Sequence, residues 1–178
     1  MIKRSLGIFF ISFSIILFVI NNTSYYYKLE TNKVIPKNNN GNYIEYVKDF
    51  THNIGYLYID TLNIKQVIKK GTSEQILNNN NVGLYKNGVE IDDNIGQIIL
   101  AGHNNKYVFG NLYKIKNNDK IIIETKQGKQ LFIVNNKIII NSNDTSYFKK
   151  NSSSKELILI TCINKNKRLL IFAKKIQI

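Results

Sequence analysis

The sequence predicts an all-β domain: a closed or nearly closed barrel of eight short strands with short helices, preceded by an apolar N-terminal helix. Three observations lead to this prediction. Short runs of Ile, Val, Leu and Tyr alternate with polar turns rich in Asn, Gly and Lys, whereas helical periodicity is rare. The 178 residues suffice for one domain with its own core and an N-terminal extension. Only one cysteine is present, so no internal disulfide can form and stability must come from that core.

The expected strands are apolar runs bounded by turn residues. In chain order they cover Ile54–Asp60, Asn63–Lys69, Val82–Tyr85, Gln97–His103, Asp119–Thr125, Lys129–Ile140, Glu156–Cys162 and Arg168–Ala173. Lys126–Gly128 is expected to be a hairpin turn, and Asn141–Ser154 a polar loop. Thr72–Gln75 have the capping-box pattern, which predicts a helical turn through Leu77. The Asn-rich stretch Asn78–Asn81 is expected to be an ordinary loop.

The N-terminus has the outline of a membrane-targeting segment. Lys3 and Arg4 precede the apolar run Leu6–Ile20, and Tyr25–Tyr27 follow at the position expected of a membrane–water interface. The residues after the run lack the small-x-small pattern that a signal peptidase reads. We therefore expect residues 1–24 to be an uncleaved, single-pass signal-anchor in the cell membrane, with the folded domain outside the cytoplasm. A cleaved signal peptide would place the domain in the same compartment.

Residues 25–52 are expected to form a polar stalk, because they contain the only proline and an Asn-rich run. Tyr43, Val47 and Phe50 recur at helical spacing and predict a short helix within this stretch. The folded domain is then expected over residues 53–178.

The chain is basic, with 25 Lys and Arg against 12 Asp and Glu and a formal net charge of +13. This charge suits contact with an anionic membrane or wall polymer. Nucleic acid is not an expected partner, because the lysines are scattered instead of forming one stripe with interleaved aromatic residues. No His, Cys and Asp residues have the spacing of metal ligands, so neither a metal nor another cofactor is expected.

The single cysteine, Cys162, ends an apolar run and is followed six residues later by Arg168. If the intervening turn centres on Lys165, residues whose numbers sum to 330 face each other, and Cys162 lies opposite Arg168. Opposed residues in an antiparallel pair have Cβ atoms about 4.5–5.5 Å apart. A fixed positive charge at that distance from a thiol favours the reactive thiolate.

His103 ends the apolar run that begins at Gln97, where a strand delivers a side chain to the barrel rim. Cys162 also ends a strand, and a Cys–His pair is the usual arrangement for nucleophilic acyl transfer. Arg168 could then donate hydrogen bonds to a developing oxyanion or to the carbonyls of a bound peptide. The other histidine, His52, precedes the first strand and is expected to be a surface residue.

Each of these residues alone also fits a structural role. A lone cysteine at a strand end is usually a small buried apolar residue, and an arginine after a lysine-rich turn is usually solvated. A non-enzymatic, basic, membrane-tethered wall-binding module, with Cys162 in its core, is therefore one alternative. The placement of all three residues at strand ends favours a shared site instead.

The order of several segments resembles the sortase family of cysteine transpeptidases. These segments are Ile54–Ile59, Val67–Ser73, Leu100–His103, Phe109–Leu112, Leu159–Cys162 and Arg168. The resemblance covers roughly Ile54 to Ile176, essentially the whole predicted domain. The ordered set of a histidine after Ala-Gly, a Thr-Cys at a strand end and an arginine on the last strand is a specific signal, whereas each element alone is weak.

The resemblance implies an eight-stranded barrel on the outer face of the membrane of Gram-positive bacteria. It implies that Cys162 attacks a backbone carbonyl in a Leu-Pro-x-Thr-Gly-type sorting signal near the C-terminus of a surface protein. An amine of a peptidoglycan precursor or of a pilin lysine would then resolve the thioacyl enzyme. By the same resemblance His103 is the general acid/base, and Arg168 steadies the oxyanion or the substrate. Ala101 and Thr161 would line the peptide groove.

Another cysteine acyltransferase of the cell wall, an L,D-transpeptidase, is the second alternative. Such enzymes normally show Gly-Cys, whereas Cys162 follows Thr161. The resemblance does not single out a sortase class. The connection from Cys162 to Arg168 is shorter than in the class A pattern, and the Asn141–Ser154 loop is shorter than the usual class B insertion.

Overall fold

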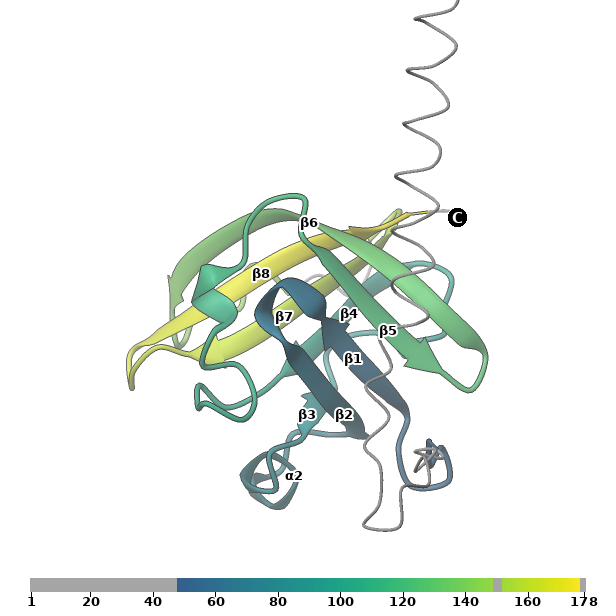
Figure 1. Cartoon of the computed structure of the whole chain (residues 1–178). Coiled ribbons are helices and arrows are strands. Elements are labelled where there is room, and N and C mark those ends of the chain that lie inside the picture. The colour runs from purple at the N-terminus through teal and green to yellow at the C-terminus, as the bar shows by residue number, and fades with distance from the viewer. Residues whose placement is uncertain (1–47, 149–151, 177–178) are drawn as a thin grey trace, which may run out of the picture. The chain divides into compact units, whose positions relative to one another are not determined.

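The computed structural model of the protein describes residues 48–148 and 152–176. Those from Asp49 onwards belong to a compact unit, Asp49–Ile178. Its elements are β1 (Gly55–Ile59), η1 (Asp60–Leu62), β2 (Ile64–Lys70), α2 (Glu74–Asn78), β3 (Val82–Leu84), β4 (Gly96–Ala101), η2 (Leu112–Lys114), β5 (Lys120–Thr125), β6 (Gly128–Asn141), β7 (Lys155–Cys162) and β8 (Lys167–Lys175). Strands dominate, and the helices are short connections between them (Figure 1).

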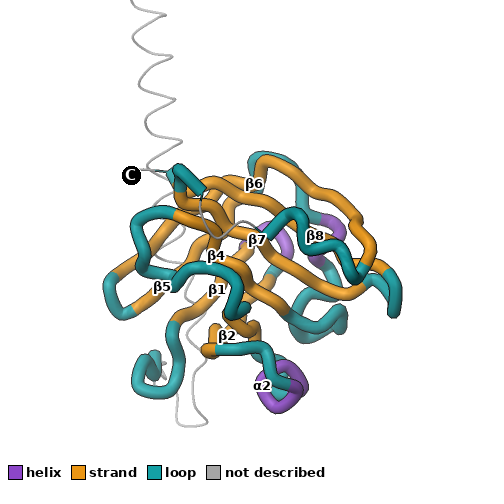
Figure 2. Tube along the Cα trace, turned by 180° about the vertical axis from the view of Figure 1, so that it is seen from behind, coloured by secondary structure: helices purple, strands orange, loops and turns teal. Residues whose placement is uncertain are grey.

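The strands close a barrel in the order β1-β2-β3-β4-β7-β8-β6-β5. Two neighbouring pairs are parallel, β2 with β3 and β4 with β7, and the others are antiparallel. The parallel pairing brings β4 alongside β7, although the two strands are far apart in the chain (Figure 2). Since parallel neighbours point the same way, the carboxyl ends of β4 and β7 meet at one end of the barrel.

The main core fills the barrel interior. The alternation of buried and partly exposed residues in β5 shows how a strand contributes to this core. Ile121, Ile123 and Thr125 are buried, and the residues between them are partly exposed. Each fully buried aliphatic side chain contributes about 1.5–3 kcal/mol relative to its exposed state. Fully buried members from other elements include Leu57, Ile68, Phe109, Leu112, Phe132, Leu157 and Ile171.

A second, smaller group of buried side chains lies on the outside of the barrel wall. We call it the outer cluster, and it consists of Ile99, Ile140, Ile158, Ile160 and Leu170. It is covered in part by two aromatic side chains with rings 6.1 Å apart, Tyr85 and Phe148. Strand β7 is therefore buried on both faces, which explains why its sequence is continuously apolar instead of alternating.

The eight predicted strands are confirmed, with ends shifted by a few residues. Strand β4 ends at Ala101, so His103 lies two residues beyond the strand and not at its last position. The predicted helical turn is α2, but the side chain of its N-cap residue Ser73 makes no capping hydrogen bond, so the expected capping box is wrong in that detail. The two 3-10 helices, η1 and η2, were not predicted, because three-residue helices have no periodic signal.

The predicted signal-anchor, residues 1–24, lies outside the described residues, as do Tyr43 and Val47 of the predicted stalk helix. Phe50 is described and belongs to no regular element. In the part of the chain that is described, no helix is both long and apolar enough to cross a membrane. The division into residues 1–24, 25–52 and 53–178 stays a prediction.

The end of β7 opposite Cys162 is held by a buried lysine. Lys155 pairs with Gly96 at the start of β4, and its Nζ donates to the Ile91 carbonyl oxygen at 2.6 Å. Burial lowers the pKa of Lys155 to about 8. The loop that precedes β4 is thus fixed against the first residue of β7. This contact helps to set the register in which β4 and β7 pair.

Candidate active site

The hairpin of β7 and β8 places a thiol beside a guanidinium. Cys162, the last residue of β7, pairs with Arg168 in the β7–β8 register, as the sequence predicted. The Ile163 amide donates to the Lys167 carbonyl oxygen at 2.9 Å, which closes the turn immediately beyond this pair. Cys162 is exposed and not disulfide-bonded, so its sulfur is accessible to a reactant.

The register of β4 against β7 directs the segment that carries His103 towards the end of β7. Each β4 residue pairs with the β7 residue 59 positions later, up to Ala101 opposite Ile160. The pairing continues past the strand end, because the Gly102 amide donates to the Ile160 carbonyl oxygen at 3.1 Å. His103 and Cys162 are the next residues along the two chains at the same 59-residue offset, one position beyond the last backbone hydrogen bond between these segments.

Residue parity shows which face of the barrel wall carries these side chains. In β7, Ile158 and Ile160 belong to the outer cluster, and Cys162 follows them at the same two-residue period. In β8, Arg168 precedes Leu170 of the outer cluster by two residues. The thiol and the guanidinium therefore project from the outer face, at the edge of the outer cluster.

Close packing explains the glycine that precedes His103. A Cβ atom on Gly102 would lie 2.7 Å from Cδ2 of Phe109, whose ring is fully buried in the main core. The Phe109 amide in turn donates to the His103 carbonyl oxygen at 3.0 Å. The Ala-Gly-His and Phe-Gly segments of the sequence are thus two parts of one packed loop, which holds the histidine backbone in place.

His103 also has a side-chain partner. Its Nε2 lies 3.0 Å from Oδ1 of Asn78, the last residue of α2. The sequence analysis missed Asn78, since it lies in an Asn-rich stretch with no pattern that distinguishes it from a loop. Only the spatial contact identifies it.

Thr161 is 3% exposed, and its Oγ1 donates to the Gly102 carbonyl oxygen at 2.9 Å. This bond ties the residue before Cys162 to the residue before His103. Ala101 is partly buried and packs against the outer cluster. The expectation that Ala101 and Thr161 line a peptide groove stays a prediction. The hydrogen bond to the Gly102 carbonyl oxygen gives the Thr161 hydroxyl a structural role as well.

Replacing Thr161 with valine should lower both stability and activity. Valine keeps the shape but leaves the buried Gly102 carbonyl without its donor, which costs about 1–3 kcal/mol. Urea unfolding measures the loss, and Thr161→Ser should recover most of it because serine restores the hydroxyl. Equal stability of the valine and serine variants would contradict this role of the hydroxyl.

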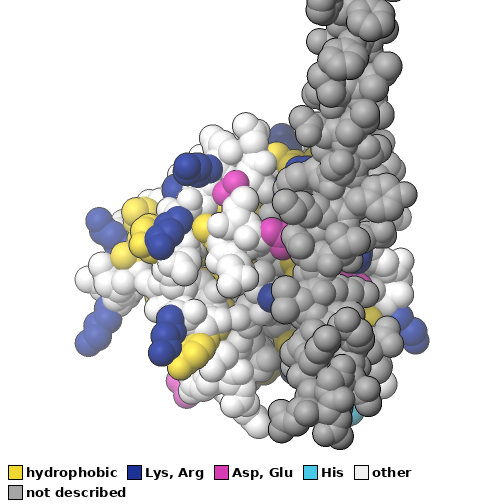
Figure 3. All heavy atoms as spheres, in the orientation of Figure 1, with side chains coloured by type: hydrophobic (Ala, Val, Ile, Leu, Met, Phe, Trp, Pro, Cys, Tyr) yellow, Lys and Arg dark blue, Asp and Glu magenta, His cyan; other side chains and the backbone are white. Residues whose placement is uncertain are grey.

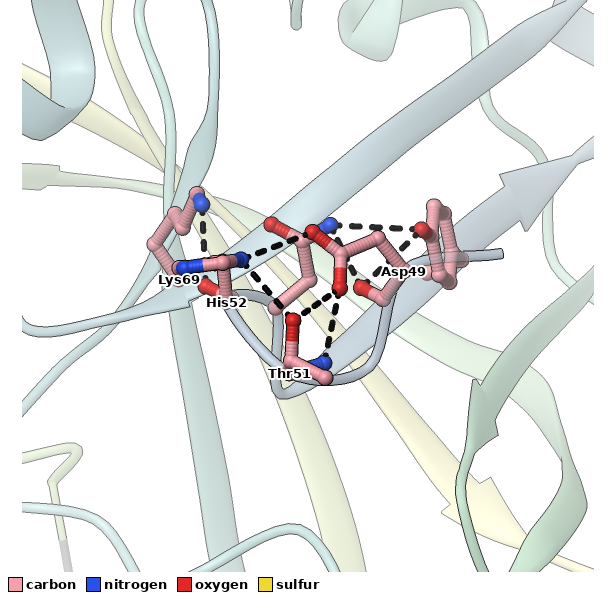
Figure 4. Close-up of polar contacts among 6 residues, drawn as sticks. Asp49, Thr51, His52 and Lys69 are labelled. Carbon is pink, nitrogen blue, oxygen red and sulfur yellow. Dashed lines mark hydrogen bonds and ion pairs between the residues drawn. The ribbon is translucent and has the colours of Figure 1, made fainter. Parts of the chain in front are cut away.

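His52 lies apart from this arrangement, in the segment before β1 (Figure 4). Its side chain is 79% exposed, and its Nδ1 lies 3.0 Å from Oδ2 of Asp49 and 2.8 Å from Oγ1 of Thr51. Hydrogen bonds from Thr51 hold the pKa of Asp49 well below its usual range. Lys69 of β2 donates to the His52 carbonyl oxygen, so the network fastens this segment to the barrel. The prediction of a surface residue is confirmed.

Charged side chains form no single patch on the face shown in Figure 3, where lysine and arginine stand at several separate places. Among residues 48–148 and 152–176, no three His, Cys, Asp or Glu side chains gather closely enough to hold a metal ion. The strand ends described above carry a thiol and a guanidinium on paired residues, Cys162 and Arg168, and β4, which pairs with β7, is followed two residues later by the imidazole of His103. Together they can perform nucleophilic attack, proton transfer and oxyanion stabilisation.

Comparisons with known proteins identify relatives of the chain and structures of the same fold. The chain is 30% identical to sortase D of Bacillus subtilis (strain 168) over 128 residues, which make up 68% of this chain and 63% of that protein. The match thus spans less than two thirds of that relative. A sortase D5 transpeptidase of Clostridium perfringens shares 27% identity with a TM-score of 0.65, over 70% of this chain and 79% of that one. Sortase C1 of Streptococcus agalactiae has the same fold, with 24% identity and a TM-score of 0.67 over 73% of this chain and 70% of that one.

The family model described as the sortase domain matches residues 57–176, which includes every strand of the barrel from within β1 to β8. This match, together with the Bacillus relative, shows that the chain belongs to the sortase family.

Proposed function

We propose that this protein is a cysteine transpeptidase that cleaves a Leu-Pro-x-Thr-Gly-type sorting signal and transfers the new carboxyl end to an amine. The observation that supports the proposal is the register of β4, β7 and β8: Cys162 pairs with Arg168, and β4 pairs with β7 up to Ala101 opposite Ile160, two residues before His103 and Cys162. Family membership supports the same reaction, and the Clostridium relative is described as a transpeptidase.

In the first half of the reaction, the Cys162 sulfur attacks a backbone carbonyl of the sorting signal. The thiol proton passes to the His103 imidazole, and the carbonyl oxygen gains negative charge as the carbon becomes tetrahedral. The Arg168 guanidinium donates hydrogen bonds to that oxygen. When the tetrahedral carbon collapses, the carbon–nitrogen bond breaks, the imidazolium gives its proton to the leaving amine, and a thioester to Cys162 remains.

In the second half, an acceptor amine replaces the leaving amine. It attacks the thioester carbonyl, His103 removes a proton from it, and the Cys162 sulfur leaves as the thiolate or thiol. Because Cys162 is exposed, a second large substrate can approach the thioester. The acceptor is proposed to be an amine of a peptidoglycan precursor or of a pilin, and the donors are surface proteins that carry the sorting signal.

The outer cluster gives the substrate an apolar surface beside the nucleophile. Ala101 packs on this cluster, and the loop between β6 and β7 adds Phe148 and Tyr147. The Tyr147 and Phe172 rings are 6.1 Å apart. We place the apolar residues of the sorting signal on this surface, with Ala101 and Thr161 at its edge.

The proposed location is the outer face of the cell membrane, with residues 1–24 as a single-pass anchor. The apolar run Leu6–Ile20 and the basic residues before it support this location. A net charge of +13 favours contact with an anionic envelope. The two relatives at 30% and 27% identity are both named sortase D, which supports a class D enzyme.

Mass spectrometry of the full chain with a peptide library tests the function. Peptides of the Leu-Pro-x-Thr-Gly type should leave an acyl group on Cys162 that equals the N-terminal part of the peptide. Addition of glycine peptides or lysine-containing acceptors should release it as a transfer product. An acyl group derived instead from a peptidoglycan stem peptide would identify an L,D-transpeptidase. A Cys162 that is alkylated by iodoacetamide but acylated by no peptide would rule the proposed reaction out.

A further inference from the structure

The turn at the end of α2 contacts the loop that carries His103 at two points. Asn78 Oδ1 lies 3.0 Å from His103 Nε2, and Asn105 Nδ2 donates to Asn80 Oδ1 at 3.3 Å. In both pairs the partners are 25 residues apart in the chain. Two parallel contacts of this kind fix the distance and the rotation of one segment relative to the other.

The α2 turn is held in its own conformation. Asn80 has a φ of 58°, in the left-handed region that asparagine tolerates better than most residues. Its amide donates to the Leu77 carbonyl oxygen at 3.1 Å, and Asn81 Nδ2 donates to the Ile76 carbonyl oxygen at 3.2 Å. The turn can therefore present Asn78 and Asn80 at fixed positions.

The loop that carries His103 is equally well held. Asn105 Oδ1 accepts hydrogen bonds from the amides of Tyr107 and Val108 at 2.9 and 3.0 Å. The Gly110 amide donates to the Asn105 carbonyl oxygen at 2.7 Å. A Cβ atom on Gly110 would lie only 2.5 Å from that oxygen, so no larger residue fits there without a shift. The contact between Asn105 and Asn80 thus joins two rigid segments.

The contact with Asn78 favours one tautomer of the His103 ring. An amide oxygen has lone pairs and no proton to donate, so the hydrogen bond forms only when Nε2 carries the proton. In the neutral imidazole this leaves the lone pair on Nδ1. In the proposed reaction, Nδ1 would then be the atom that exchanges protons with Cys162 and the leaving amine.

We propose that two side chains of the turn at the end of α2, Asn78 and Asn80, position the catalytic histidine. Asn78 selects the tautomer and fixes the ring rotation of His103, and Asn80 holds the loop through Asn105. This inference rests on the proposed function, in which His103 is the acid/base. It assigns a role to the Asn-rich stretch, whose sequence predicts only a loop.

Asn78→Ala should lower kcat/KM for the cleaved peptide by roughly five- to twentyfold, because the ring loses one hydrogen bond and its fixed rotation. The loss should fall on kcat, since Asn78 does not touch the substrate in this arrangement. Asn79→Ala is the matched control, because Asn79 is an exposed neighbour outside both contacts and should retain wild-type kinetics. Equal kinetics of the two variants would overturn the proposal.

The pH profile separates positioning from a general structural effect. Asn78→Asp puts a carboxylate on Nε2, which favours the imidazolium, so the alkaline limb of kcat should move up by roughly half a pH unit or more. Asn80→Gly keeps the left-handed turn but removes the side-chain amide that contacts Asn105. We expect kcat to fall by roughly two- to fivefold, with the alkaline limb of the pH profile at its wild-type position. An alkaline limb that stays at the wild-type pH in Asn78→Asp contradicts the contact with His103.

A readout that needs no substrate distinguishes failure of this inference from failure of the proposed function. In the full chain with nitrogen-15-labelled histidine, His103 should show the Nε2-protonated tautomer, and Asn78→Ala should populate both tautomers. The His52 signals serve as the reference, since the Nδ1 of that ring contacts Asp49 and Thr51. An unchanged His103 spectrum in Asn78→Ala overturns the inference even if the enzyme is active. A changed spectrum supports it, and loss of the reaction in His103→Ala then tests the function separately.

Discussion

Replacing Cys162 with alanine should abolish cleavage of the sorting-signal peptide, with a fall in kcat of at least about a thousandfold. Cys162 is the only cysteine of the chain, so no other thiol can form the thioester. Fluorogenic peptide cleavage measures the rate, and the acyl adduct should vanish from the mass spectrum.

The same substitution should leave the fold intact. Because Cys162 is exposed at the end of β7, its loss creates no internal cavity, and the free energy of unfolding should change by no more than about 0.5 kcal/mol. Thermal unfolding of the variant provides this control. Retained peptide cleavage in a folded Cys162→Ala protein would remove the basis of the proposed mechanism.

Replacing Arg168 with alanine should lower kcat by roughly 10²–10³-fold, because the developing oxyanion loses a charged donor. The backbone of Arg168 is paired on both sides, with Cys162 of β7 and with Ile140 of β6, so the guanidinium starts from a well-fixed position. Arg168→Lys should recover only part of the activity, since lysine keeps the charge but loses the planar fork of donors.

Lys167 offers a matched control for Arg168. It precedes Arg168 in β8, is exposed, and points to the other face of the strand. Lys167→Ala removes the same formal charge, so its kcat should stay near the wild-type value. A loss in Arg168→Ala no larger than the loss in Lys167→Ala would mean that the arginine acts only through net charge.

The local part of the fold was readable in the sequence. The pairing of Cys162 with Arg168 follows from a short turn, because a short hairpin leaves little freedom in register. The individual strands follow from apolar runs and turn residues. These signals depend on neighbours in the chain, which is why simple patterns captured them.

The non-local part was not readable from the residues alone. Nothing in the pattern of β4 states that its neighbour is β7, with Ala101 opposite Ile160, and only this register brings His103 to Cys162. The same limit explains why Asn78 was missed, since its partner lies 25 residues away. The strand-end positions of histidine, cysteine and arginine favoured a shared site, and the family resemblance made that grouping specific.

The parallel pairing of β4 with β7 has a consequence for biosynthesis. Synthesis runs from the N-terminus, so the loop that carries His103 leaves the ribosome well before β7 and β8. It cannot pack against these strands until they have been synthesised. Pairing β4 with β7 closes a loop of 59 residues. This pairing forms late, because the conformational entropy of the loop must be lost before the contacts between the two strands compensate for it. The residues of the proposed site therefore come together only once β4 has paired with β7.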